Sequence, residues 1–195
     1  MTHRPTVVFA TQPPLVLARV IEVSSPHGIA PVTPEDLPEA QDLATRLMEH
    51  KVASLETYLR VQTVQPAAVL VSKEDGRITG VVGMLFLRQA GADQFLDGVF
   101  DALEPDSDLL TQEGESPVAL YAWGVAASTK EGGQAILGGG GAVRFGLFPT
   151  ITSLTRAVTG AGRHVALTRY GYRPMRHPDD ELMVSEPTLA AERAA

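Results

Sequence analysis

An apolar run followed by paired glycines constrains the fold more than any other feature of this chain. Val118 to Gly124 indicates a strand, and Val125 to Ala135 follows it with the sequence VAASTKEGGQA, ahead of a run with helical potential. A strand followed by a short loop and the start of a helix favours anion binding. The loop amides and the first helical N–H groups lack backbone partners, and the helix dipole favours negative charge there. Gly132 and Gly133 would let a ligand approach the backbone, and Lys130 adds positive charge.

Two common nucleotide-binding motifs are absent from the chain. The P-loop pattern Gly-x-x-x-x-Gly-Lys-Ser/Thr does not occur. The dinucleotide fingerprint Gly-x-Gly-x-x-Gly fails in the glycine-rich region because Val143 and Arg144 stand where a third glycine is needed. The anion site suggested by the glycine loop therefore belongs to another class.

The composition is that of a globular domain. The chain has 195 residues, of which 44% are hydrophobic and 20% charged, enough for one domain with a sizeable core. The absence of cysteine excludes disulfides, thiolate metal sites and cysteine nucleophiles. The five histidines show no ligand spacing, so we expect no metal site. A net charge of −7 argues against general nucleic-acid binding.

Targeting signals are also missing from the sequence. The N-terminus has no signal-peptide pattern, and no apolar run is long enough to span a bilayer. We therefore expect a cytoplasmic protein that does not bind membranes.

Periodicity and turn residues predict the order of the elements. The turn at residues 74–77, Glu-Asp-Gly-Arg, predicts a hairpin over residues 67–87, apolar on both faces and so covered on both sides. Glycines 138–141 lie inside a predicted helix, which requires a close neighbour or a bend there. The predicted strands are 6–10, 15–23, 67–72, 78–87, 118–125, 151–158, 172–176 and 181–185. The predicted helices begin near Thr33 and Ser54 and cover 135–147 and 163–170.

Residues 88–117 form a distinct acidic segment, with eight acidic residues and one basic residue, Arg88. Phe95, Val99 and Leu103 recur at helical spacing, which predicts one amphipathic helix followed by a polar loop. Two interpretations stay open. The segment is either a solvated surface insertion, as most charged runs are, or an acidic rim that attracts a cationic acceptor.

The glycine loop and a later motif resemble the landmarks of the GCN5-related N-acetyltransferase (GNAT) family. Lys130 to Ala135, KEGGQA, is similar to the acyl-CoA signature Gln/Arg-x-x-Gly-x-Gly/Ala, with Lys in first place. Val165 to Pro174 resembles the short helix that ends in Gly-Tyr and turns into a strand. The motifs lie at the family's usual separation. The resemblance covers residues 28–187 and implies an α/β fold with a mixed, mostly antiparallel central sheet, helices on both faces and splayed strands forming a CoA slot.

The resemblance implies acetyl-CoA or coenzyme A as the cofactor. It places the pantetheine arm against the backbone of Val125 and Ala127, at the end of the strand. The residues that it assigns to the pyrophosphate are Lys130, Glu131, Gly132, Gly133, Gln134 and Ala135. Glu131 departs from the family pattern, because it puts a negative charge where members usually have glycine.

Tyr121 and Tyr170 are the candidate catalytic residues. The family's common base and acid do not carry over, because Ala119 and Leu167 stand at those positions. Tyr121 shares strand parity with Ala119 and Trp123, and is either a proton relay facing the acceptor or a core aromatic. Tyr170 is either the acid that protonates the leaving thiolate or a packing residue.

Together these features predict an acyl-CoA-dependent N-acyltransferase. It would transfer an acetyl group to a small-molecule or protein amine by direct attack in a ternary complex. The alternative is a non-catalytic CoA-binding or interaction module on the same fold. The predicted organisation is an N-terminal strand extension (1–27), the acetyltransferase-like domain (28–187) and a flexible tail (188–195), and it leaves room for a homodimer.

Overall fold

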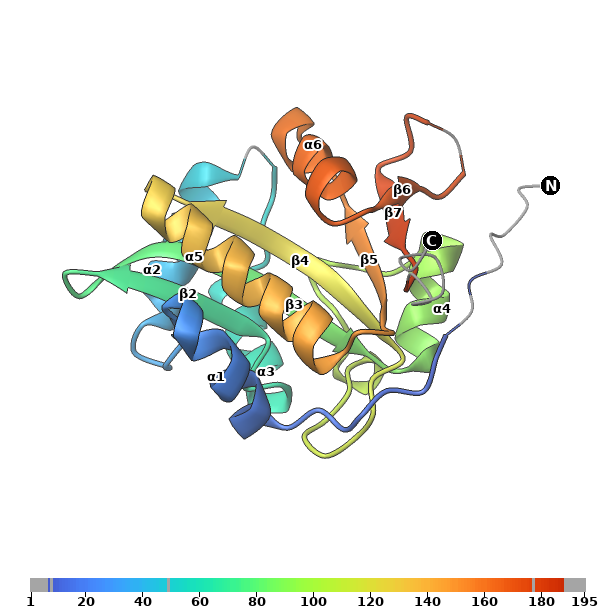
Figure 1. The fold of residues 1–195 in the computed structure, drawn as a ribbon, viewed down its shortest axis with the longest axis horizontal. Helices are drawn as coiled ribbons and strands as arrows, with labels where there is room; N and C mark the ends of the chain where they lie inside the picture. Colours follow the sequence, from blue (N-terminus) through green and yellow to red (C-terminus); the bar gives the residue numbers. More distant parts are fainter. Residues whose placement is uncertain (1–6, 8, 49, 177, 188–195) are drawn as a thin grey trace, which may run out of the picture.

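A seven-stranded mixed sheet organises the chain (Figure 1). The computed structural model describes residues 7, 9–48, 50–176 and 178–187. The strand order is β1-β2-β3-β4-β5-β7-β6, and every pairing is antiparallel except β4 with β5. The strands are β1 (Ile29–Pro31), β2 (Val69–Glu74), β3 (Arg77–Leu87), β4 (Ala119–Ala127), β5 (Thr152–Arg156), β6 (Arg173–Pro174) and β7 (Leu182–Ser185).

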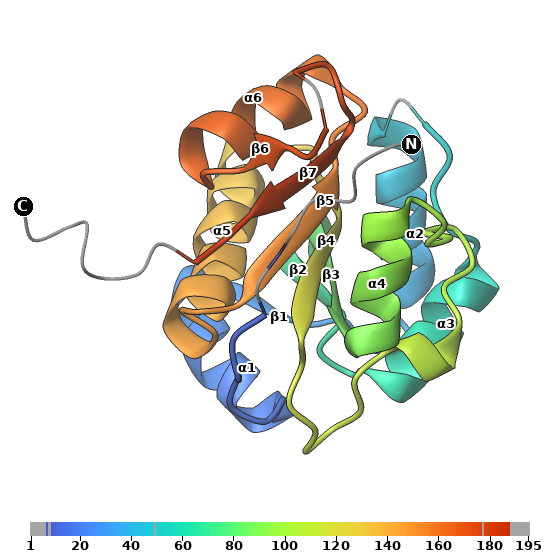
Figure 2. The ribbon, with the colours of Figure 1, turned by 90° about the vertical axis from the view of Figure 1, so that its right-hand side faces the viewer.

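Helices cover both faces of this sheet. They are α1 (Leu17–Ser24), α2 (Leu37–Leu47), α3 (Leu55–Val64), α4 (Gln89–Asp97), α5 (Lys130–Gly141) and α6 (Gly160–Arg169). Two short 3-10 turns, η1 (Ser25–His27) and η2 (Ser107–Leu109), and a π-helical segment, η3 (Ala142–Leu147), complete the order. Figure 2 shows α1 and α5 on one side of the sheet and α2, α3 and α4 on the other. None of the helices in the described residues is long and apolar enough to cross a membrane.

The core divides into two layers because strand side chains alternate between faces. Leu85 and Leu87 pack into the cluster under α2, α3 and α4, whereas Phe86 packs with Phe148 and Ile136 on the α5 side. The predicted burial on both faces is therefore confirmed. The predicted hairpin is also confirmed, with residues 75 and 76 both at positive φ in its two-residue turn.

The N-terminal prediction is wrong for residues 15–23, where the chain forms α1 instead of a strand. Val20 in this helix and Leu15 just before it are both buried in the α5-side core cluster. The helix therefore buries one apolar face. Glu113 holds the N-terminus of α1 by accepting the N–H of Leu17 (2.9 Å), which satisfies an amide that the helix leaves open. Of the strand predicted over residues 6–10, the described residues 7, 9 and 10 are not in a strand, and residues 6 and 8 lie outside the described part.

Three helix boundaries differ from the prediction. Helix α2 begins at Leu37, because residues 34–36 form a turn in which Thr33 accepts the Asp36 N–H. Helix α4 ends at Asp97, where Gly98 takes a left-handed conformation and leaves Val99 68% exposed. Helix α5 begins at Lys130, five residues before its predicted start. The tail predicted at 188–195 lies outside the described residues, and the proposed division of the chain at residues 27 and 187 stays a prediction.

The glycine run of α5 is explained by close packing against its neighbours. A Cβ on Gly138 would lie 2.9 Å from His27 Nδ1, and one on Gly139 would collide with Ile29 Cδ1. Both expected consequences of the run are present: another element packs very close, and the regular helix gives way to the π-helical segment η3 directly after Gly141.

We expect Gly139→Ala to lower the free energy of unfolding by about 1–3 kcal/mol, because its methyl group would overpack the contact with Ile29. Gly146→Ala is the matched control, since Gly146 is exposed and nothing lies within 4 Å of the point that its methyl group would occupy, and helix propensity favours alanine there by about 1 kcal/mol. Urea unfolding of both variants measures the difference. Equal midpoints would contradict the close-packing explanation.

Candidate active site

Strands β4 and β5 separate partway along their length, and this opens the sheet. Their parallel pairing runs from Ala119 with Thr152 to Ala122 with Thr155, where Thr155 Oγ1 donates to the Ala122 carbonyl (3.1 Å). Beyond this point β4 continues to Ala127 paired with β3 alone (Figure 1). In the described part of the chain, the β5-facing edge of β4 has no strand partner there. Its backbone N–H and C=O groups are therefore available to an extended ligand.

A β-bulge at Trp123 reverses the faces of β4 at the point of separation. Gly83 pairs with Gly124 and Met84 with Ala122, so Trp123 is the extra residue. The indole N–H of Trp123 donates to the Ala102 carbonyl (2.6 Å), and its ring stacks on Tyr58 with centroids 4.8 Å apart. Ala119, Tyr121 and Trp123 all contact the cluster under α2, α3 and α4, so the predicted shared face is confirmed, and the alternation is offset only beyond Trp123.

A cavity of about 550 Å³ fills the gap between the separated strands. Its walls are formed by the ends of β4 and β5 and by the helices α5 and α6. Of the predicted cofactor-binding residues, Val125, Ala127 and Gly133 line it, and so does the catalytic candidate Tyr170. The other predicted cofactor-binding residues, which are Lys130, Glu131, Gly132, Gln134 and Ala135, lie outside its lining.

The N-terminus of α5 is partly satisfied by its own cap. Thr129 Oγ1 accepts the N–H of Gly132 (2.9 Å), and the Thr129 carbonyl accepts that of Gly133 (3.0 Å). Among the described residues, the N–H groups of Lys130 and Glu131 have no recorded hydrogen bond, as expected for the first turn of a helix. These two amides, rather than those further along α5, are the open donors of this terminus.

The paired glycines serve by their small size and not by positive φ, which neither adopts. A Cβ on Gly132 would lie 2.7 Å from the Thr79 carbonyl oxygen, so this glycine lets α5 pack against β3. A Cβ on Gly133 would meet only the Ala127 Cβ, at 3.6 Å, and it faces the cavity. Gly132 thus permits close packing within the protein, and the approach of a ligand to Gly133 stays a prediction.

Two carboxylates oppose anion binding at this helix terminus. Glu74 Oε1 accepts a hydrogen bond from the hydroxyl of the capping Thr129 (3.0 Å), and Glu131 lies in the first turn of the helix. Lys130 contributes the opposing positive charge. The site thus combines open amides and a lysine with two acidic groups.

Arg144 is a buried cation in the wall of the cavity, and sequence reasoning missed it. Its side chain donates to the Tyr170 carbonyl (3.1 Å) and to Ser185 Oγ (2.5 Å), and its guanidinium lies 4.6 Å from the Phe145 ring centroid and 5.1 Å from that of Tyr172. Burial lowers the pKa of Arg144. In the described residues no carboxylate forms an ion pair with it. The Tyr170 carbonyl at the end of α6 and the aromatic rings interact with the charge instead of a carboxylate. Because Arg144 also bonds to Ser185 on β7, it fixes α6 to β7.

The candidate Tyr170 is engaged in packing and hydrogen bonding. Its hydroxyl donates to the Leu137 carbonyl on α5 (2.9 Å), and its ring stacks on Phe145 with centroids 6.3 Å apart. Burial raises its pKa. Tyr170 thereby ties α6 to α5 across the cavity.

The candidate Tyr121 lies on the opposite side of the bulge, beside a second cavity of about 300 Å³. Its ring packs against Phe95 and Phe100 with centroids 5.2 and 5.5 Å away. Burial raises the pKa of Tyr121 to about 12, although Arg156 opposes the shift. Trp123 lines both cavities and so marks where they adjoin. The structure thus separates the two tyrosine candidates.

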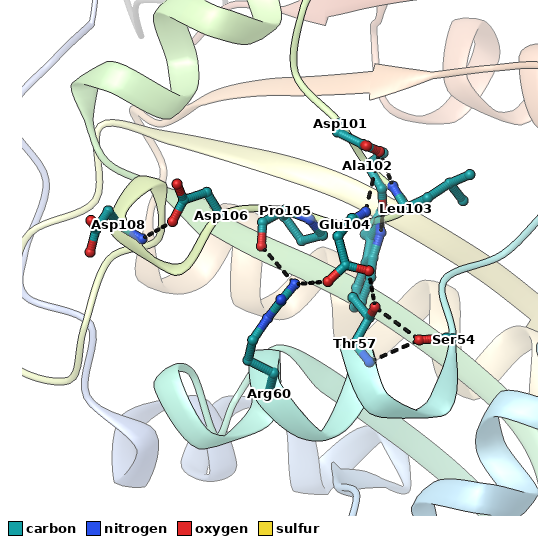
Figure 3. A network of polar contacts seen from close by, with 11 residues as sticks. Ser54, Thr57, Arg60, Asp101, Ala102, Leu103, Glu104, Pro105, Asp106 and Asp108 are labelled. Carbon is teal, nitrogen blue, oxygen red and sulfur yellow. Dashed lines mark hydrogen bonds and ion pairs between the residues drawn. The ribbon is translucent and has the colours of Figure 1, made fainter.

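The acidic insertion, residues 88–117, uses several carboxylates to hold its own shape. Glu104 accepts the hydroxyl hydrogen of Thr57 (2.8 Å) and pairs with Arg60 (2.6 Å), as Figure 3 shows. Asp101 Oδ1 accepts the N–H of Leu103 (2.9 Å). These bonds place residues 100–103 along the second cavity.

Comparison with known proteins gives matches among solved structures alone. No protein-family model matches the sequence, and no curated protein matches it. A structure described as histone acetyltransferase HPA2 and related acetyltransferase, from Corynebacterium glutamicum, has 17% identity and a TM-score of 0.50, covering 83% of this chain and 96% of that one. Naa20 from Chaetomium thermophilum, in complex with a bisubstrate analogue, has 14% identity and a TM-score of 0.51, covering 85% and 89%. Both likenesses concern the fold.

We expect the stability of the protein to fall between about pH 10 and pH 12. A folded-state pKa near 12 for Tyr121 and Tyr58, against about 10 in the unfolded chain, favours the folded state below pH 10 and loses this contribution as the pH rises toward 12. Tyr121→Phe should therefore lose less stability over this range than the wild type, by up to about 1.4 kcal/mol per pH unit. Urea unfolding at pH 9, 10 and 11 measures the slopes. Parallel slopes would show that Tyr121 ionises normally.

Proposed function

We propose that this chain, which has the GNAT fold, is an acyl-CoA-dependent N-acyltransferase, with acetyl-CoA as the donor. The observation that carries the proposal is the 550 Å³ cavity between β4 and β5, which joins an unpaired strand edge to the N-terminal region of α5. A thioester on a long amide-containing arm that ends in a pyrophosphate fits this combination. The acetyltransferase description of the Corynebacterium glutamicum structure, and the bisubstrate analogue bound to Naa20, support the class of reaction.

In this proposal the cofactor lies along β4. The amide groups of the pantetheine arm hydrogen-bond to the unpaired backbone of Val125 and Ala127, as in an added strand. The pyrophosphate meets the open N–H groups of Lys130 and Glu131 and the Lys130 side chain. Gly133 leaves room for it, because its missing side chain faces the cavity.

The reaction is an acyl transfer between two bound reactants. The neutral amine nitrogen attacks the thioester carbonyl carbon, the C–S bond then breaks, and coenzyme A leaves as the thiolate. The nitrogen loses a proton to solvent and the thiolate gains one. Holding both reactants at the β4 bulge supplies much of the rate. Tyr121 and Tyr170 stay our candidates for the proton donor, and because burial raises the pKa of both, each is a weaker acid than a free tyrosine.

The carboxylates near the α5 terminus favour one alternative, a non-catalytic module that binds coenzyme A or a partner. Glu74 and Glu131 lower the anion affinity expected of a helix N-terminus. Turnover decides between the two functions: incubation with acetyl-CoA and a panel of amines should release free thiol above the rate of spontaneous hydrolysis. Binding of acetyl-CoA without amine-dependent thiol release would support the module instead.

Gly133→Val should weaken acetyl-CoA binding at least tenfold, because its side chain would project into the cavity where the cofactor passes. Gly146→Val is the matched control: Gly146 lies outside the cavity lining and has open space around it, so affinity should stay at the wild-type value. Isothermal titration calorimetry of the three proteins gives the comparison. If Gly133→Val binds acetyl-CoA with wild-type affinity, the assignment of the cofactor to this cavity is wrong.

Glu131→Gln should tighten acetyl-CoA binding by about two- to fivefold at low salt, because it removes a negative charge beside the phosphates. The gain should shrink in high salt, which screens exposed charges. Glu56→Gln, an exposed glutamate in the first turn of α3, is the control and should change nothing. Weaker binding by Glu131→Gln would mean that this carboxylate supports the site.

A further inference from the structure

Two buried tyrosines border the second cavity with hydroxyl groups that lack partners. Tyr58 is 7% exposed and Tyr121 is 3% exposed, and both line this cavity. In the described part of the chain neither hydroxyl has a recorded hydrogen bond. The only fully enclosed side-chain polar atom without a partner among those residues is Thr111 Oγ1, so the two tyrosine hydroxyls reach open space. A hydroxyl that opens into a cavity takes its partner from whatever fills the cavity, so a ligand with a polar group can bond to both tyrosines here.

Aromatic rings dominate the buried lining of the second cavity, and the charged residues that line it are exposed. Its described carboxylates, Asp101 and Glu181, are both exposed at the rim, as are the basic side chains of Lys51, Arg156 and His50. Asp101 is further occupied by the backbone amides of its own turn. An ammonium group drawn into this cavity would lose its hydration without gaining a buried counter-ion, which is strongly unfavourable.

The aromatic rings do not replace that counter-ion. A cation binds over the face of a ring. Here the faces of Tyr58 and Trp123 cover one another at a centroid distance of 4.8 Å, with 28° between their planes. Tyr121 meets Phe95 in a tilted contact, with 48° between the ring planes, and Phe100 in an edge-to-face contact at 69°. The cavity therefore offers ring edges and hydroxyls, which suit a flat neutral ligand.

We propose that the second cavity binds the acceptor, and that the acceptor is a small aromatic amine, uncharged at neutral pH, whose nitrogen contacts the hydroxyls of Tyr58 and Tyr121. This inference rests on the proposed function, because it assigns the second substrate of the same reaction. A volume of about 300 Å³ lies at the small end of ligand-binding pockets, which suits one ring with a short substituent. A neutral hydroxyl accepts an amine N–H, which leaves the nitrogen lone pair available for the attack.

The position of the cavity suits the chemistry. Trp123 lines both cavities at the bulge, so an amine bound beside Tyr121 lies close to the end of the slot proposed for the thioester. Only the neutral amine carries the lone pair that attacks. A cavity that rejects the ammonium form therefore selects the reactive form of the acceptor, and Tyr58 and Tyr121 act as specificity-determining residues.

Binding without cofactor tests the inference directly. Trp123 is the single tryptophan, so it gives one indole N–H signal in a proton–nitrogen NMR spectrum. Aniline and cyclohexylamine both carry one amine on a six-membered ring, but aniline is flat and neutral near pH 7, whereas cyclohexylamine is puckered and protonated. We expect aniline to shift the Trp123 signal with at least tenfold higher affinity than cyclohexylamine near pH 7, and the gap to narrow as the pH approaches 10. Equal affinities near pH 7, or tighter binding of cyclohexylamine, would overturn the inference.

Hydroxyl deletion gives the second test. Tyr58→Phe and Tyr121→Phe keep the ring packing and should each weaken aniline binding about fivefold, while the calorimetric affinity for acetyl-CoA stays at the wild-type value. The two proposals fail separately. If acetyl-CoA binds and aniline does not, the acceptor inference is wrong and the proposed function stands. If aniline binds and acetyl-CoA does not, the proposed function is wrong, and with it the assignment of this cavity to an acceptor.

Discussion

The end of the β4–β5 pairing is the constraint on which the rest of the structure depends. Parallel strands cannot be joined by a hairpin, so the chain crosses from β4 to β5 through α5, whose N-terminus begins directly after β4. Because pairing stops at Ala122 with Thr155, the same feature leaves one edge of β4 unpaired, opens the cavity and places the helix N-terminus beside it. The bulge at Trp123 then directs alternate residues of β4 toward two different cavities.

Helix α5 and the segment after it keep this opening from collapsing. Gly132 and Gly139 let α5 lie against β3 and β1, whereas Gly133 and Gly140 leave its other side open to the cavity. Arg144 holds the opposite wall, because its guanidinium joins the end of α6 to β7. Among the described residues this buried cation has two hydrogen-bond acceptors and no acidic partner, so its contribution is to fix the position of the two elements more than to stabilise the fold. The cavity is thus bounded by close packing on one wall and by directed hydrogen bonds on the other.

The sequence predicted those features that depend on local pattern. The hairpin turn, the order of the central elements and the burial of both sheet faces follow from turn residues and periodicity. The α1 helix was mistaken for a strand because its β-branched residues outweighed its amphipathic spacing. Arg144 and Tyr58 escaped notice because their roles arise from elements distant in the chain: η3 meets β7, and α3 meets the bulge of β4. Only Thr129, a good N-cap, could have corrected the start of α5 from local chemistry.

The acidic insertion shows why charge counted along a sequence is a poor guide to charge at a site. Its eight carboxylates suggested a cationic acceptor, yet Glu104 is paired with Arg60, Glu115 with Arg88, and Glu113 with the N-terminus of α1. These bonds fix the loop that closes over β4, and the groups that this loop turns toward the second cavity include Phe100 and Ala102. These carboxylates thus shape the loop, and the buried side chain that it presents there, Phe100, is uncharged. If the acceptor binds in this cavity as proposed, it enters as the neutral amine, and no group then has to remove a proton from it before the attack.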